Sequence, residues 1–183
     1  MRTASSRTAK TARKRVESDR PERALKPAST VNKAKSSAQL LLWRHAQAEE
    51  GEDDAARPLT PRGRKQALRV ARWLEARLPD HYRLIASPAV RAQQTAQALS
   101  RRFLTDPELS VDSSPRRMLA SIGWPEASGT TLLVGHQPSL GALAALLVAG
   151  RSESWNIRKG ALWWLERRDG GVSIRTVIDP SLI

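Results

Sequence analysis

Short apolar runs recur along the chain from about residue 40 onward. The first, LLLW at 40–43, is too short to span a membrane and too continuous for an amphipathic helix, so it predicts a strand buried on both faces. Similar runs, RLIAS and TTLLV, predict strands at 83–87 and 130–134. Two further strands, at 161–166 and 172–178, are expected to form a hairpin because Asp-Gly-Gly joins them.

Helical patterns lie between these runs. Thr60 is placed to cap a helix that begins at Pro61, and apolar positions recur at helical spacing as far as Leu78. A second helix is expected to open at Pro88, and we assign Ser87 to its cap. Both helices therefore begin where a predicted strand or loop meets a proline.

The second half of the chain continues the alternation. A strongly apolar helix is expected over 139–149, a further strand over 109–112, and only a short helix in the irregular segment 113–129. Strands that alternate with helices indicate an α/β fold. We expect a three-layer α/β/α sandwich with a mostly parallel central sheet and an antiparallel end.

Charged side chains follow the ends of two predicted strands. Arg44 and His45 come directly after the first strand, and His136 follows the strand at 130–134. Arg91 lies one turn into its helix, so its guanidinium can reach back over the same edge of the sheet. Open α/β sheets bind ligands at the carboxyl ends of their strands. The four side chains are therefore expected to converge.

This set of side chains suits phosphoryl transfer. The guanidiniums of Arg44 and Arg91 can give forked hydrogen bonds to phosphoryl oxygens and stabilise the charge of the transition state. Backbone N–H groups near Gln137, where a helix begins, would add donors. Neutral imidazole is a competent nucleophile, which makes His45 the candidate to attack phosphorus, with His136 as a donor to the phosphoryl oxygens.

Composition narrows the classes of function. The chain has 183 residues and no cysteine, which excludes disulfides, thiolate metal sites and a cysteine nucleophile. A metal held by His45 and His136 is disfavoured because the nearby arginines repel cations and no third ligand has suitable spacing. No run approaches the roughly 20 apolar residues of a membrane span, and the start lacks the apolar core of a signal peptide. We expect a soluble, cytoplasmic protein without membrane association.

The net charge of +13 is concentrated at the start of the chain. Residues 1–38 hold eleven basic and three acidic side chains, a net charge of +8, and almost nothing large and apolar. We expect a disordered basic extension followed by one domain over 39–183. The extension could contact RNA, DNA or another polyanion, could act as a targeting segment, or could reflect a start codon assigned too far upstream.

Four ordered blocks resemble the histidine phosphatase superfamily and, within it, the small SixA-like phosphohistidine phosphatases. The blocks are LLLWRHAQAE at 40–49, RPLTPRGRKQA at 57–67, SPAVRAQQTA at 87–96 and LLVGHQPSL at 132–140. The resemblance implies a phosphoglycerate mutase-like fold and a phosphatase that works through a covalent phosphohistidine, without metal or organic cofactor. It also implies His45 as the nucleophile and Arg44, Arg91 and His136 as the phosphate-binding shell.

The general acid is the part of the family pattern with no clear counterpart. The acid-phosphatase type has Asp directly after the second His, where this chain has Gln137, and Ala46 stands where many members have Gly. Glu126 and the acidic loop 49–54 are possible proton donors. Such an acid speeds loss of an alkoxide by about 10²-fold to 10⁴-fold, whereas a phosphoramidate leaves as imidazole and can take its proton from solvent.

These observations favour one substrate class. We expect the enzyme to remove phosphate from phosphohistidine in a signalling or phosphotransfer protein. The alternatives are a phosphatase of small-molecule phosphomonoesters, and a non-catalytic module that binds phosphate or a polyanion.

Overall fold

The computed structural model describes residues 37–151, 153–168 and 171–183, so the predicted extension over 1–38 lies almost wholly outside the described part. One six-stranded sheet has the order β3-β2-β4-β1-β5-β6. The strands are β1 (Ala38–Arg44), β2 (Tyr82–Ala86), β3 (Leu104–Thr105), β4 (Gly129–Gly135), β5 (Leu162–Arg168) and β6 (Gly171–Ile178). Strands β3, β2, β4 and β1 are parallel, whereas β5 and β6 are antiparallel to their neighbours.

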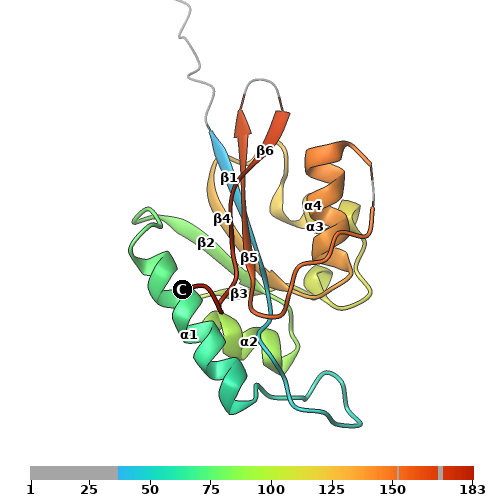
Figure 1. The fold of residues 1–183 in the computed structure, drawn as a ribbon. Helices are drawn as coiled ribbons and strands as arrows, with labels where there is room; N and C mark the ends of the chain where they lie inside the picture. Colours follow the sequence, from blue (N-terminus) through green and yellow to red (C-terminus); the bar gives the residue numbers. More distant parts are fainter. Residues whose placement is uncertain (1–36, 152, 169–170) are drawn as a thin grey trace, which may run out of the picture. The chain divides into compact units, whose positions relative to one another are not determined.

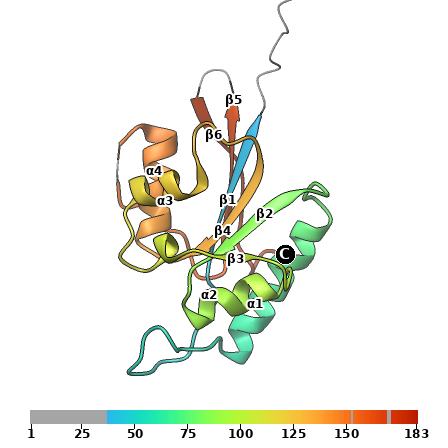
Figure 2. The same ribbon diagram turned by 180° about the vertical axis from the view of Figure 1, so that it is seen from behind.

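Helices cover both faces of the sheet (Figures 1 and 2). Helices α1 (Pro61–Glu75) and α2 (Val90–Gln97) pack on one face, and α3 (Pro115–Ile122) and α4 (Ser139–Ala149) pack on the other. The predicted three-layer α/β/α sandwich, with its mostly parallel sheet and antiparallel end, is confirmed. The turn of the predicted hairpin, at 169–170, lies outside the described residues.

Strand β1 lies in the interior of the sheet because its apolar run is unbroken. Leu41 and Trp43 enter the core under α1 and α2, while alternate residues Leu40 and Leu42 enter the core under α3 and α4. Strand β1 is paired in parallel with β4 over its whole length, from Ala38 to Arg44. Both strands therefore end at the same edge of the sheet.

One predicted strand needs correction. The strand expected over 109–112 is wrong: β3 lies earlier, and Pro107–Leu109 forms a 3₁₀ turn in which the Asp106 carboxylate accepts from the N–H of Glu108 at 2.8 Å. Leu109 is fully buried through that turn rather than through a strand. The short helix expected in the following segment is present as α3.

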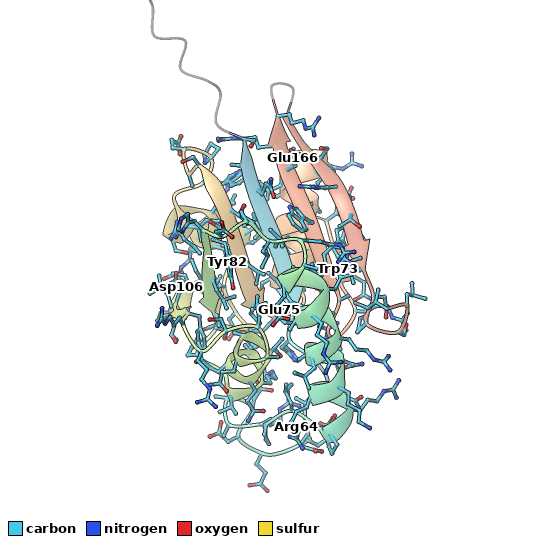
Figure 3. The ribbon with its side chains drawn as sticks, turned by 90° about the vertical axis from the view of Figure 1, so that its left-hand side faces the viewer. Arg64, Trp73, Glu75, Tyr82, Asp106 and Glu166 are labelled. Atoms are coloured by element: carbon cyan, nitrogen blue, oxygen red, sulfur yellow. The ribbon has the colours of Figure 1, made fainter. Side chains whose placement is uncertain are left out.

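Helix α1 begins at Pro61 as expected but ends at Glu75, before the predicted end at Leu78. The Thr60 hydroxyl accepts from the N–H of Gly63 at 2.8 Å, and Pro61 occupies the first helical position. Figure 3 looks onto the face that α1 covers, with Arg64 toward the start of the helix and Glu75 at its end.

No helix in the described part of the chain has both the length and the apolarity needed to cross a bilayer.

Candidate active site

His45 follows β1 directly, and backbone hydrogen bonds hold it from two sides. Its N–H donates to the carbonyl of Gly135 at 3.0 Å, and its own carbonyl accepts from the N–H of Gly160 at 3.0 Å. The residue is 7% exposed. Two neighbouring segments thus fix the backbone that carries the imidazole.

The hydrogen bonds of the His45 ring define its tautomer. Nδ1 lies 2.8 Å from the carbonyl oxygen of Ala46, which can only accept, so Nδ1 carries the proton. Nε2 is therefore unprotonated, and its lone pair accepts a hydrogen bond from Nε–H of Arg91 at 3.3 Å. Burial lowers the pKa of His45 to about 3, so the ring is neutral at physiological pH. A neutral imidazole with an unprotonated Nε2 can act as a nucleophile.

The side chain of Arg91 contacts the rings of both His45 and His136. Its side chain comes from the first turn of α2, and the residue is 2% exposed. Besides the contact with His45, its Nη2 lies 3.4 Å from Nδ1 of His136 and 2.7 Å from the carboxylate of Asp54. Its Nη1 donates to the backbone carbonyl of Asp54. The guanidinium therefore connects both rings to the loop after β1.

His136 is oriented by a buried serine. Its Nε2 lies 2.7 Å from Oγ of Ser87. Because the Arg91 guanidinium can only donate, Nδ1 of His136 accepts and Nε2–H donates to Ser87. Burial lowers the pKa of His136 to about 4. Ser87 does not occupy the N-cap position of α2, which is Ala89 and has no side-chain cap, but its Oγ accepts from the N–H of Ala89 at 3.3 Å.

These groups line a cavity of about 230 Å³ at the carboxyl edge of the parallel strands. Its charged lining is four cations and one carboxylate: Arg44, Arg57, Arg91, Lys159 and Asp54. Nη1 of Arg44 donates to the carbonyl of Ile157 at 2.7 Å, while its buried Nε has no hydrogen-bond partner among the described residues. The excess of positive charge suits an anionic ligand.

Asp54 is the only carboxylate among the described residues that line the cavity. It accepts hydrogen bonds from Arg91 and Arg57, and these lower the pKa of its carboxyl group. The carboxylate is therefore ionised at neutral pH. In this state it has no proton to give to a leaving group.

The structure brings four of the sequence candidates together, namely Arg44, His45, Arg91 and His136. Gln137 also lines the cavity, with its side-chain amide donating to the carbonyl of Trp155. Glu126 is not brought to the site. It is exposed in the loop before β4 begins, whereas His136 follows the other end of that strand.

Sequence reasoning gave no role to two cations of the cavity. Arg57 begins the RPLTPRGRKQA block at 57–67, so the resemblance to the family could have indicated that it belongs to the site. Lys159 has no such motif. It reaches the cavity because the neighbouring Gly160 is hydrogen-bonded to His45, a long-range contact.

Sequence comparison places the chain among known proteins. The family model of the histidine phosphatase superfamily (branch 1) matches residues 40–116. An uncharacterized protein from Picosynechococcus sp. is 32% identical over 156 residues, which cover 79% of this chain and 93% of that protein.

Solved structures share the fold over most of the chain. A Nakamurella multipartita protein described as a candidate SixA phosphohistidine phosphatase has a TM-score of 0.67 at 26% identity, covering 79% of this chain and 96% of that one. The protein histidine phosphatase SixA, complexed with tungstate, has a TM-score of 0.66 at 24% identity, covering 79% and 98%. An α-ribazole phosphatase from Shigella flexneri shares the fold at 19% identity and a TM-score of 0.63, covering 78% and 96%. The chain belongs to the histidine phosphatase superfamily and is SixA-like within it.

Proposed function

We propose that this phosphatase removes phosphate from phosphohistidine in a signalling or phosphotransfer protein, through a covalent phosphohistidine at His45. The observation that carries the proposal is the ionised state of Asp54, which Arg91 and Arg57 maintain. A phosphomonoester would have to expel an alkoxide without a proton from this carboxylate. An N-linked phosphate leaves as imidazole and needs no such acid.

In the first step, Nε2 of His45 attacks phosphorus, and a new N–P bond forms as the bond to the substrate nitrogen breaks. The leaving nitrogen keeps the electron pair and takes a proton from solvent. Arg44 and Arg91 donate to the phosphoryl oxygens, where negative charge spreads in the transition state. His136, held by Ser87, lies beside the same group.

In the second step, water attacks the phosphorus bound to His45, and the electron pair of the N–P bond returns to Nε2. The water gives its oxygen and one hydrogen to phosphate and releases its other proton to solvent. The Nδ1 proton, held by the carbonyl of Ala46, keeps the phosphorylated ring cationic and therefore a good leaving group. The enzyme returns to its starting tautomer.

The size of the cavity supports a side chain as substrate. Pockets that enclose a drug-sized ligand have volumes of roughly 300–1,000 Å³. The cavity here, about 230 Å³, is smaller. A phosphorylated ring that projects from a protein needs only its tip enclosed.

The test is phosphate release from a histidine-phosphorylated protein and from a panel of small phosphomonoesters, without added metal. The variants are His45→Ala and, as a matched control, His81→Ala, which changes an exposed histidine outside the cavity. We expect turnover of the phosphoprotein by the wild type and the control, and none by His45→Ala. Only the two active proteins should form an acid-labile phosphoenzyme.

Two other results would overturn the proposal. Turnover of monoesters alone, lost in His45→Ala, would retain the nucleophile and replace the substrate class with small phosphomonoesters. Phosphate binding without any turnover would indicate a non-catalytic module.

A further inference from the structure

Basic side chains form a stripe along the exposed side of α1. Arg62, Lys65, Arg69 and Arg72 follow one another at intervals of three or four residues, which places them on one face of the helix. All four are exposed. We call these four residues the α1 stripe, which at 1.5 Å per residue extends over about 15 Å.

Helix α1 carries most of the net charge of the folded part. It has five basic residues and one acidic residue, a net charge of +4, and residues 37–183 together have 20 basic and 15 acidic residues, a net charge of +5. Like charges three or four residues apart destabilise a helix. The α1 stripe therefore persists at a cost to the free energy of folding.

Carboxylates of the described residues do not neutralise the stripe. Within 37–151, 153–168 and 171–183, no ion pair joins a stripe residue to an acidic side chain, whereas Arg117 and Arg151 pair with Glu108 and Glu153. Arg69 does donate to the backbone carbonyl of Pro180 at 3.1 Å. The cationic heads of the stripe are thus available to an anionic partner.

The stripe begins beside the mouth of the cavity. The start of α1 packs on the chain just after His45. The N–H of Thr60, the N-cap, donates to the carbonyl of Gln47 at 3.0 Å, and the side chain of Gln66, in the second turn, accepts from the N–H of Gln47 at 3.1 Å. The next residue, Ala48, lines the cavity. Figure 1 shows α1 leading away from the edge at which β1 ends.

We propose that the α1 stripe docks an acidic surface of the protein that carries the phosphohistidine, so that the phosphorylated ring is guided into the cavity. The proposal rests on the proposed function. A row of carboxylates would complement the stripe and raise the rate of productive encounter. Leu68, next to the stripe and 45% exposed, adds apolar contact area.

An acidic protein fits these observations better than a nucleic acid. The stripe leads to a cavity lined by several cations and a buried nucleophilic ring, an arrangement that suits a terminal phosphoryl group. The internal phosphodiesters of RNA or DNA do not offer such a group. A protein with a phosphorylated side chain offers both the terminal phosphoryl group and flanking carboxylates.

The experiment compares three substrates: phosphoimidazole and two phosphohistidine peptides of equal length, one with Asp and Glu flanks and one with Ser and Gly flanks. The stripe variant is Arg62→Glu/Lys65→Glu/Arg72→Glu, which keeps Arg69 and its bond to Pro180. The matched control is Arg101→Glu/Arg102→Glu/Arg116→Glu, which reverses three other exposed cations that are outside the cavity lining. All proteins retain the full chain, so the basic extension contributes equally.

We expect the wild type and the control to prefer the acidic peptide by at least about 10-fold in kcat/KM at low salt. The stripe variant should lose this preference through KM while keeping its kcat and its turnover of phosphoimidazole. Raising the salt concentration to 0.5 M should weaken the preference of the wild type, since charges at a surface are screened.

Equal kcat/KM for the two peptides in the wild type would overturn the docking proposal, as would an equal loss in the control. Oligonucleotide binding that only the stripe variant loses, without any peptide preference, would assign the surface to nucleic acid. Failure of the proposed function has a different signature: no turnover of phosphoimidazole or of either peptide. In that case, anisotropy with the unphosphorylated acidic peptide still decides whether the stripe binds it.

Discussion

The carboxylate of Asp54 lies 2.7 Å from Nη2 of Arg91, on a guanidinium that also contacts both pocket histidines. A phosphoryl group placed for attack by His45 would draw on the same donors. Under the proposed mechanism, Asp54 and the substrate would therefore compete for Arg91. The carboxylate is 57% exposed and belongs to the loop after β1, so it can yield without disturbing the sheet.

Replacing Asp54 by Asn should tighten the binding of inorganic phosphate and tungstate by about 3-fold to 10-fold, because it removes a negative charge worth about 1 kcal/mol of repulsion. Isothermal titration of the two anions measures the effect. Glu52→Gln, in the same loop and exposed, is the control. Weaker anion binding in Asp54→Asn would instead show that the carboxylate is needed to position Arg91.

Ser87→Ala should impair His136 without removing it. The change leaves the buried Nε2–H of His136 without its partner, at a cost of about 1–3 kcal/mol in the free energy of unfolding, and frees the ring to rotate. We expect kcat to fall about 10-fold. Ser121→Ala removes a half-buried hydroxyl in α3, away from the cavity, and should leave kcat unchanged. An unaltered kcat in Ser87→Ala would refute the orienting role.

The two buried histidines make stability depend on pH. The pKa values of His45 and His136 are about 3 and about 4 in the folded chain, below the ordinary value of about 6.5. Between pH 4 and 6.5 the unfolded chain therefore binds protons that the folded chain does not. The stabilising contribution is complete above pH 6.5 and is lost as the pH falls through this range.

Urea denaturation at pH 5, 6 and 7 measures this dependence. Each histidine should contribute a slope of up to about 1.4 kcal/mol per pH unit. His136→Gln should reduce the slope. Identical slopes in the wild type and His136→Gln would contradict the burial argument.

Gly63→Ala should disturb the chain just after His45. A Cβ at Gly63 would lie 1.9 Å from the carbonyl oxygen of Gln47, a backbone atom that cannot move aside cheaply. We expect a lower melting temperature, by several degrees or more, together with reduced activity. Gly51→Ala is the control, because a Cβ there would lie 3.4 Å from the flexible side chain of Arg57. Equal melting temperatures for the two variants would refute the close approach.

The fold could be predicted to the extent that local patterns determine burial. The run at 40–43 has no polar position, so it required a strand covered on both faces, and the core on either side of β1 agrees. Leu109 shows the limit of this reasoning. Its apolar character indicated a buried residue correctly, but the turn that Pro107 and Asp106 impose, rather than a strand, brings it to the core.

The site could be predicted where topology alone decides position. His45 and His136 follow parallel neighbours, so their convergence required only that β1 and β4 be adjacent. The partners of these histidines could not be found in the same way. Ser87 looks like a helix cap from its neighbours in sequence, and its bond to His136 joins residues 49 positions apart. Such contacts depend on the finished packing of the sheet.

Strand β1 lies between β4 and β5, and this position limits how its backbone amides exchange with solvent. The strand is hydrogen-bonded to a neighbour on each side and covered by helices on both faces. Its backbone amides can exchange with solvent only when the whole sheet comes apart, so their exchange should report global unfolding. The loop that holds Asp54 lies outside the sheet and is largely exposed, so we expect its amides to exchange through local opening. The candidate site thus combines His45, which directly follows a strand expected to exchange slowly, with Asp54 in a loop expected to exchange faster.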